Sequence, residues 1–253
     1  MEKFPIISIN ISTGLYQNFL SRIIEMTEND STYTCIANVH MLVEAYKDPG
    51  FSAIVNNADM VTPDGVPLTW GLKLIHGIKQ ERVAGMDLLP DLLKLAEEKL
   101  VPVYFYGGTE DMLCKIDKNI KPKYPNLHIA GTYSPPFKPL SIEKEQEIII
   151  HINDSGAKLV FVILGCPKQE KWMSSMKGKI NATMVGIGGA LPVLLGLQKR
   201  APKWMQNAGL EWVFRFCQEP RRLFKRYTIT NTLFFFLIIR EWLYSKFKNP
   251  AYK

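Results

Sequence analysis

The residues Pro63, Asp64 and Gly65 bring a single carboxylate to the point where an apolar run gives way to a helix-like segment. Proline restricts the approach of the chain and glycine permits a sharp turn, so the Asp64 side chain would lie at the end of a strand. A carboxylate placed there can serve as a general base that takes a proton from a hydroxyl group. The same carboxylate can instead be a turn residue whose oxygens accept hydrogen bonds from backbone N–H groups. The three residues alone favour the turn, so the choice depends on the rest of the chain.

Two glycine-rich turns are candidates for binding a phosphate group. Gly107 and Gly108 follow one apolar run, and Gly186, Gly188 and Gly189 follow another. Each turn stands between an expected strand and an expected helix, where free backbone N–H groups and the helix dipole attract an anion. Neither turn completes the dinucleotide fingerprint, and the sequence has no Walker A pattern. A tight connection without a ligand is the better interpretation of either turn alone, whereas two such turns on one sheet edge leave that interpretation and a nucleotide site equally open.

Gln169, Cys166 and His40 are further candidates for a polar site. Cys166 stands beside Lys168, a setting that can activate a thiol, but no histidine lies nearby in the sequence, so we expect a small buried side chain. Gln169 is the better candidate for a polar contact to a ligand. His40 follows Asn38 by two residues and either lines the pocket or is a structural histidine.

The composition is that of a globular protein without structural metal or disulfides. The chain has 253 residues, 47% of them hydrophobic, and can bury a full core. The four cysteines are widely spaced and the four histidines lack metal-ligand spacing. The N-terminal segment has no basic stretch followed by an unbroken apolar one, so we expect no cleaved signal and a cytosolic location.

Six short apolar runs, each followed by a Gly, Pro or Asp break, predict strands that are buried on both faces. They span residues 32–38, 58–65, 101–108, 128–136, 158–167 and 182–189. Segments of helical pattern lie between them, including 85–100, 109–120 and 141–156, with Thr109 as an N-cap. Strands that alternate with helices predict an α/β fold with a mainly parallel, doubly wound sheet and helices on both faces. Ligands bind such sheets beyond the carboxyl ends of the strands.

The net charge of +7 is concentrated near the C-terminus. Residues 199–253 contain twelve Lys or Arg and three Glu, which leaves the rest of the chain slightly negative. We interpret Trp204, Trp212 and Trp242, which are interleaved with these cations, as packing residues or interfacial anchors. The apolar run 232–239 is far shorter than the roughly 20 residues that span a bilayer. The segment therefore either lies in the membrane interface or forms a helical pair on the main domain with a solvated basic face.

Seven segments, taken together and in their order, resemble the bacterial WecG/TagA/CpsF glycosyltransferases. The matching segments are residues 37–49, 58–70, 81–93, 106–108, 164–173, 185–196 and 199–227. Members of this family attach an N-acetylmannosamine-type sugar from a UDP donor to a lipid-linked N-acetylglucosamine. The resemblance covers most of the chain, and its specificity comes from the seven segments in combination.

The resemblance implies a Rossmann-like core of the GT-E type over residues 1–198 and a helical, membrane-associating appendage over residues 199–253. It implies an inverting transfer from a UDP-sugar to an undecaprenyl-type lipid-linked acceptor, with no cofactor and no required metal. It further implies a cytoplasmic protein bound peripherally to the anionic inner face of the cell membrane. A homo-oligomer stays open, and no nucleic acid is expected as a partner.

The resemblance also assigns roles to individual residues. The Asp of the family's PDG motif is the proposed general base and corresponds to Asp64, and a neighbouring Asn in the pocket corresponds to Asn38. Ile36 stands where the family often has Thr, which puts in doubt a hydroxyl contact from that position. Arginines of the appendage are placed on the donor diphosphate in the family. They match Arg215, Arg221 and Arg222, with Arg226 matching less closely.

The chemistry of such a transfer fits the residues present. A diphosphate is a good leaving group that needs no dedicated acid, so one base can suffice where glycoside hydrolysis uses two carboxylates. The planar, always charged guanidinium of Arg binds phosphate oxygens in bidentate fashion. Gly65, the two glycine turns and Gln169 are then the expected substrate-binding positions. Two other classes stay open on the residues alone, a nucleotide-binding oxidoreductase or regulator and a nucleic-acid-binding protein that uses the basic tail.

Overall fold

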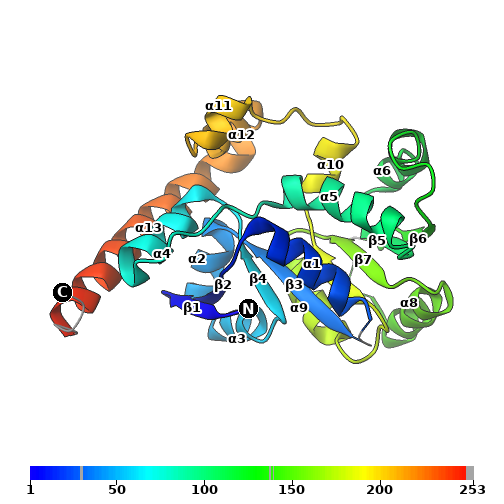
Figure 1. The fold of residues 1–253 in the computed structure, drawn as a ribbon, viewed down its shortest axis with the longest axis horizontal. Coiled ribbons are helices and arrows are strands. Elements are labelled where there is room, and N and C mark those ends of the chain that lie inside the picture. The colour runs from blue at the N-terminus through cyan, green and yellow to red at the C-terminus, as the bar shows by residue number, and fades with distance from the viewer. Residues whose placement is uncertain (29–30, 137, 139, 249–253) are drawn as a thin grey trace.

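The computed structural model describes residues 1–28, 31–136, 138 and 140–248. Its centre is a six-stranded sheet in the order β4-β3-β8-β7-β5-β6 (Figure 1), and every strand pair in it is parallel. The strands are β3 (Thr32–Ala37), β4 (Met60–Pro63), β5 (Val103–Gly107), β6 (Ile129–Tyr133), β7 (Leu159–Ile163) and β8 (Thr183–Gly186). All six expected strands are present, which confirms the α/β fold with a mainly parallel sheet.

The sheet is buried because helices pack on both of its faces. Strands β3, β5 and β7 are buried along their whole length, as expected when neither face meets water. One core contains side chains of α2 (Val39–Lys47), α3 (Pro49–Asn56), α4 (Val66–His76), α8 (Ile142–Asp154) and α9 (Lys168–Met176). The other contains side chains of α1 (Tyr16–Met26), α5 (Gly85–Glu98), α6 (Glu110–Leu113), α7 (Ile116–Ile120) and α10 (Ala190–Leu194).

The local predictions were correct except in three places. The first is β6, which was expected to be buried on both faces but lies at the edge of the sheet and is only partly buried. Thr109 is the predicted N-cap, since its side chain accepts a hydrogen bond from the Met112 N–H. The single helical segment expected over 109–120 is instead two short helices, α6 and α7, which together bury Leu113 and Ile116. An antiparallel hairpin of β1 (Lys3–Ile6) and β2 (Ile9–Ser12) precedes the sheet and was not predicted.

The strand order reverses between β3 and β8. From β3 the chain passes to its neighbour β4 at one edge, whereas it reaches β8 from the opposite side by way of β5, β6 and β7. The two halves of the chain therefore diverge at the carboxyl ends of β3 and β8. In open α/β sheets this point is where a ligand-binding crevice forms.

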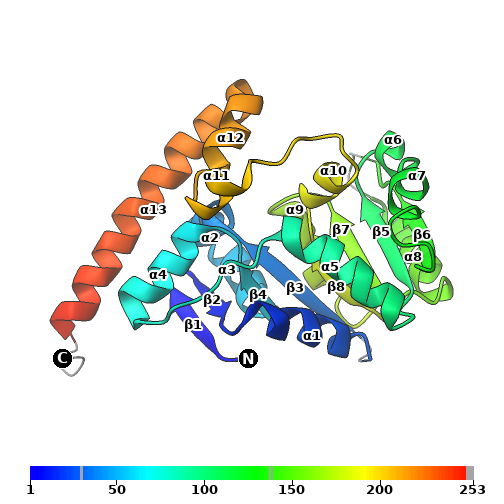
Figure 2. The same ribbon diagram turned by 45° about the horizontal axis from the view of Figure 1, so that its top comes forward.

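The C-terminal segment folds as α11 (Lys203–Asn207), α12 (Glu211–Gln218) and α13 (Pro220–Lys248). Pro220 begins α13, as its ring would predict, so the helical segment breaks between α12 and Arg221. Helix α13 runs diagonally beside α2 and α4 (Figure 2), and its Phe234 and Ile238 belong to the same core as the sheet. Within the described part of the chain, no helix has both the length and the apolar character needed to cross a membrane.

The seam between α4 and α13 depends on Gly71. A Cβ atom at this position would lie 3.2 Å from Cδ1 of Ile238 and 3.4 Å from Cδ1 of Ile6. We predict that Gly71→Leu destabilises the protein by about 1–3 kcal/mol, the usual cost of overpacking a filled core. Urea unfolding followed by circular dichroism measures the effect. Lys73→Leu, on the exposed side of the same helix, is the control, and equal stability of the two variants would contradict the prediction.

Candidate active site

Asn38 and Asp64 come together because they follow neighbouring parallel strands. Ala37 at the end of β3 pairs with Pro63 at the end of β4, so the next residue of each strand leaves the sheet at the same edge. The Asp64 N–H donates to the Ala37 carbonyl over 2.7 Å, which fixes the start of the turn. The Asn38 side-chain oxygen caps α2 by accepting from the Met41 N–H, which fixes the side chain at the start of the helix.

The turn after β4 needs the glycine that follows Asp64. Gly65 has φ +113° and is the N-cap of α4, a backbone conformation in which a side chain would be strained. The Val83 N–H donates to the Pro63 carbonyl, and the Thr62 hydroxyl donates to the Val83 carbonyl. These two bonds fasten the segment after α4 to β4, which places Arg82 beside the turn.

A cavity of about 330 Å³ lies between this sheet edge and the C-terminal segment. From the core it is lined by Asn38, Asp64 and Arg82, and from the C-terminal segment by Glu211 and Arg215. Gly65 and His40 also line it. The structure thus brings the predicted residues Asn38, Asp64, Gly65 and Arg215 into one site, although residues 64 and 215 are far apart in the chain.

Burial raises the pKa of Asp64 from its ordinary value of 3.8 to about 7. The positive charges of Arg82 and Arg215 lower the pKa of Asp64. The negative charges of Glu211 and Asp87 raise it, in addition to the effect of burial. The side chain is partly buried, and among the described residues no hydrogen bond or ion pair occupies its carboxylate. A carboxylate with a pKa near neutrality is well matched to accepting and releasing a proton at physiological pH.

Four charged residues, here called the ion-pair ring, connect the core to the C-terminal segment. Arg82 contacts Glu211 at 2.5 Å and Asp87 at 3.1 Å, and Arg200 contacts Asp87 at 2.6 Å and Glu211 at 3.8 Å. Cations and anions therefore alternate around the ring, so every charge has two partners of opposite sign. Arg82 and Asp87 belong to the core, whereas Arg200 and Glu211 belong to the C-terminal segment. The contacts Arg82–Glu211 and Arg200–Asp87 therefore hold the C-terminal segment over Asp64.

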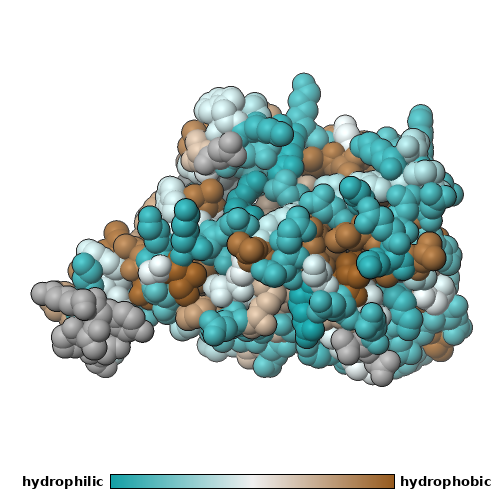
Figure 3. Space-filling model, in the orientation of Figure 1, coloured by the Kyte–Doolittle hydropathy of each residue, from teal (hydrophilic) through white to brown (hydrophobic). Residues whose placement is uncertain are grey.

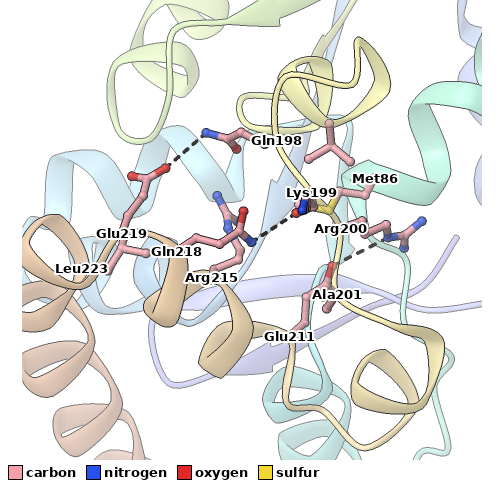
Figure 4. Close-up of a pocket in the computed structure, with 11 residues that line it drawn as sticks. Met86, Gln198, Lys199, Arg200, Ala201, Glu211, Arg215, Gln218, Glu219 and Leu223 are labelled. Atoms are coloured by element: carbon pink, nitrogen blue, oxygen red, sulfur yellow. Dashed lines mark hydrogen bonds and ion pairs between the residues drawn. The ribbon is translucent and has the colours of Figure 1, made fainter.

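Hydrogen bonds next to the ring fix the helix that carries Arg215 (Figure 4). The Gln218 side chain donates to the Lys199 carbonyl, and the Gln198 side chain donates to Glu219, both over 3.2 Å. These bonds tie the end of α12 and the residue that follows it to the irregular segment after α10. A Cβ atom on Gly189 would lie 3.2 Å from Nη2 of Arg215, so the glycine turn after β8 borders the same guanidinium.

The other glycines that the sequence singled out serve close packing. A Cβ atom on Gly107 would lie 2.7 Å from the Ile163 carbonyl group, which shows how closely β5 approaches the end of β7. Gly108 continues this contact, since its N–H donates to the same carbonyl over 2.9 Å. Neither glycine lines the cavity beside Asp64. Their contact to a ligand stays a prediction.

Gln169 joins the ends of β7 and β8 through its amide. The side-chain nitrogen donates to Glu170 at 2.6 Å and to the Gly186 carbonyl at 3.3 Å, and the oxygen accepts from the Gly165 N–H at 3.3 Å. A Cβ atom on Gly188 would lie 3.3 Å from that oxygen. Gln169 therefore holds the glycine turn after β8 in place, while a direct contact of Gln169, Gly186 or Gly188 to substrate stays a prediction.

The remaining candidates lie away from the cavity or outside the described residues. Arg221 is exposed on α13 and does not line the cavity. The side chains of Arg222 and Arg226 lie outside the described residues. Ile36 is buried in the core, and Cys166 is only partly buried, less than the sequence predicted.

The sequence reading missed Arg82 and Glu211, which complete the site. Arg82 lies inside one of the segments that carry the family resemblance, and that membership was a usable signal. Glu211 is an acid in a strongly basic stretch, where an isolated negative charge points to a fixed partner. Both residues act through contacts across more than a hundred positions of sequence, which no local motif records.

Comparison with known proteins places the whole chain in one group. The model of the "Glycosyl transferase WecG/TagA/CpsF family" matches residues 4–248. A relative from Bacillus spizizenii is 31% identical over 225 residues, which cover 88% of this chain and 86% of the relative. A relative from Bacillus subtilis (strain 168) is 31% identical over 186 residues, which cover 73% of this chain and 71% of the relative. Both are named N-acetylglucosaminyldiphosphoundecaprenol N-acetyl-beta-D-mannosaminyltransferase.

We predict that Asp64 titrates near pH 7 and that its charged neighbours shift this value in opposite directions. Glu211→Gln should lower the pKa because it removes a negative charge, and Arg82→Gln should raise it because it removes a positive one. Carbon NMR of protein labelled at the Asp carboxyl groups measures the titration, with Asp64→Asn to assign the signal. Glu147→Gln, in an exposed ion pair on α8, is the control. Titration of Asp64 near its ordinary value of 3.8 would contradict the assignment.

Proposed function

The chain belongs to the WecG/TagA/CpsF family of glycosyl transferases, and we propose on this basis that it is an inverting transferase of cell-surface polysaccharide biosynthesis. It would move an N-acetylmannosamine-type sugar from a UDP-sugar to a polyprenyl-diphosphate-linked N-acetylglucosamine. The names of the two Bacillus relatives supply the acceptor and the sugar. The observation that carries the proposal is the single cavity that Asp64 of the core and Arg215 of the appendage both line.

Asp64 is the general base in this mechanism. Its carboxylate takes the proton of the acceptor hydroxyl while the hydroxyl oxygen bonds to the anomeric carbon of the donor. The bond from that carbon to the diphosphate breaks on the opposite side, so the configuration inverts and UDP leaves with the electron pair. A pKa of about 7 leaves a substantial fraction of Asp64 ionised at neutral pH and also makes it a stronger base than an ordinary carboxylate.

Arg215 stabilises the charge that develops on the leaving diphosphate. Its guanidinium borders both the cavity and Gly189 of the glycine turn after β8, where backbone N–H groups can add further donors. Arg82 places a second cation on the same cavity. Fixed cations at the position of developing charge lower the barrier without reorganising during the reaction.

The outer side of α13 supports an association with membranes. Figure 3 shows patches of brown, separated by hydrophilic residues, where α13 lies. Large apolar side chains are exposed along this helix and recur at helical spacing. They are Phe236, Ile239, Leu243 and Phe247, here called the α13 stripe. Arg240 and Lys246 are exposed on the same helix, Arg240 beside the Tyr46 ring of α2 and Lys246 beside the Trp242 ring. An exposed apolar stripe with adjacent cations suits a peripheral position on an anionic lipid surface, where a lipid-linked acceptor is found.

Asp64→Asn should reduce turnover by about 10²- to 10⁴-fold while leaving the fold and the affinity for UDP nearly unchanged. The amide keeps the shape of the side chain but cannot accept the proton. Acceptor-dependent release of UDP measures the effect, with EDTA present to test the expected independence from metal. Asp117→Asn, in an exposed ion pair on α7, is the control. Turnover like that of the unmodified protein in Asp64→Asn would remove Asp64 as the base.

Phe236→Glu should weaken binding to vesicles that contain anionic lipids, because it places a negative charge in the α13 stripe. Co-sedimentation with the vesicles measures the bound fraction. Ile142→Glu makes the same kind of change at an exposed apolar residue on α8 and should have little effect. Equal binding by the two variants would show that the α13 stripe is not the membrane-binding surface.

A further inference from the structure

The cavity that contains Asp64 has two chemically different sides. The polar side carries the residues used in the proposed mechanism. The other side is formed where α4 and α13 face each other, and most of its lining is apolar. Its lining includes Val66, Pro67, Trp70, Tyr227, Phe234 and Phe235. Asn231 is a polar residue on this side, and Thr230 is a buried one.

The apolar side of the cavity opens at the surface of the protein. Trp70 on α4 is 57% exposed and Phe235 on α13 is 51% exposed, although both line the cavity. Aromatic side chains with about half of their surface exposed contribute little stabilisation through packing in the core. Adjacent exposed aromatic residues at a cavity are typical of a surface that binds another molecule. Phe234, the neighbour of Phe235, is in contrast 3% exposed and holds α13 on the core.

This opening is continuous with the proposed membrane surface. Phe235 is followed on α13 by Phe236 and Ile239, the first members of the α13 stripe. On an α-helix, residues three and four positions apart lie on one face, so Ile239 continues the line that begins at Phe235. A hydrocarbon chain could therefore pass from the lipid surface into the cavity without leaving apolar contacts.

We propose that the apolar side of the cavity, between α4 and α13, binds the first isoprenoid units of the lipid-linked acceptor. This inference rests on the proposed function and adds to it a subsite for the lipid. The charge distribution matches such an amphipathic ligand, since Arg82 and Arg215 lie on the polar side and the aromatic residues on the other. The sugar of the acceptor then reaches Asp64 while its hydrocarbon lies between Trp70 and Phe235.

The lipid fits this side better than the uridine of the donor. A pyrimidine ring carries hydrogen-bonding groups on its edge, and burying them without partners is costly. A side built mainly from Val66, Pro67 and aromatic rings offers few such partners. Isoprenoid units have no polar groups and gain from removal of apolar surface from water.

The test compares two acceptors that share the diphosphate and sugar but carry either a long polyprenyl chain or a short alkyl chain. Both are assayed in detergent micelles, which removes differences in membrane binding. Trp70→Ser and Phe235→Ser should each raise the KM for the polyprenyl acceptor by about tenfold, as expected when the contact of roughly two buried CH₂ groups is lost. The KM for the short-chain acceptor and the KM for the UDP-sugar should stay unchanged.

Leu74→Ser is the matched control, because Leu74 is an exposed apolar residue one turn after Trp70 on α4 and does not line the cavity. A rise in the KM for the UDP-sugar in Trp70→Ser or Phe235→Ser would overturn the proposal and assign the apolar side to the donor. An equal rise for both acceptors, or equal KM values of the unmodified protein for both, would also overturn it. In these cases transfer still occurs, whereas the absence of transfer to either acceptor would reject the proposed function itself.

Discussion

The ion-pair ring is the interaction on which the site depends. Asp64 lies at the edge of the sheet, and residues of the core line only one side of the cavity beside it. Ion pairs join Arg82 and Asp87 of the core to Glu211 and Arg200 of the C-terminal segment. These ion pairs hold the C-terminal segment in place as the other side of the cavity. Charges in a partly buried ring stabilise the assembly only while all partners are present, because a lone buried charge is costly. The raised pKa of Asp64 is thus a property of the closed assembly.

The strand order of the sheet explains why the cavity forms beside Asp64. Parallel strands present their carboxyl ends on one side, and the change in strand order between β3 and β8 opens a crevice there. Asn38 and Asp64 follow β3 and β4, and the glycine turn with Gly189 follows β8. Helix α12 brings Arg215 against that turn. Asp64 and Arg215 therefore come from distant parts of the chain but line the same cavity at this edge of the sheet.

The sequence predicted those parts of the fold that local patterns determine. Strands buried on both faces appear as short apolar runs, and the cap at Thr109 is a local signal. The PDG turn is local as well, which is why Asp64 could be identified. The contact between Arg82 and Glu211 spans 129 positions and leaves no periodic trace, so no local pattern predicted that these two residues meet. The glycine turns carry a further role that the motif does not record, since Gly107 permits a close approach of two strands.

Neighbouring apolar residues of helix α13 lie in three different environments. Four neighbouring residues turn to different sides, because successive positions on a helix are about 100° apart. Phe234 and Leu237 pack in the interior, Phe235 borders the cavity, and Phe236 is exposed. The apolar run 232–239 is thus divided among core, cavity and surface. This division lets a single helix line the cavity, stay attached to the core and keep an exposed apolar side.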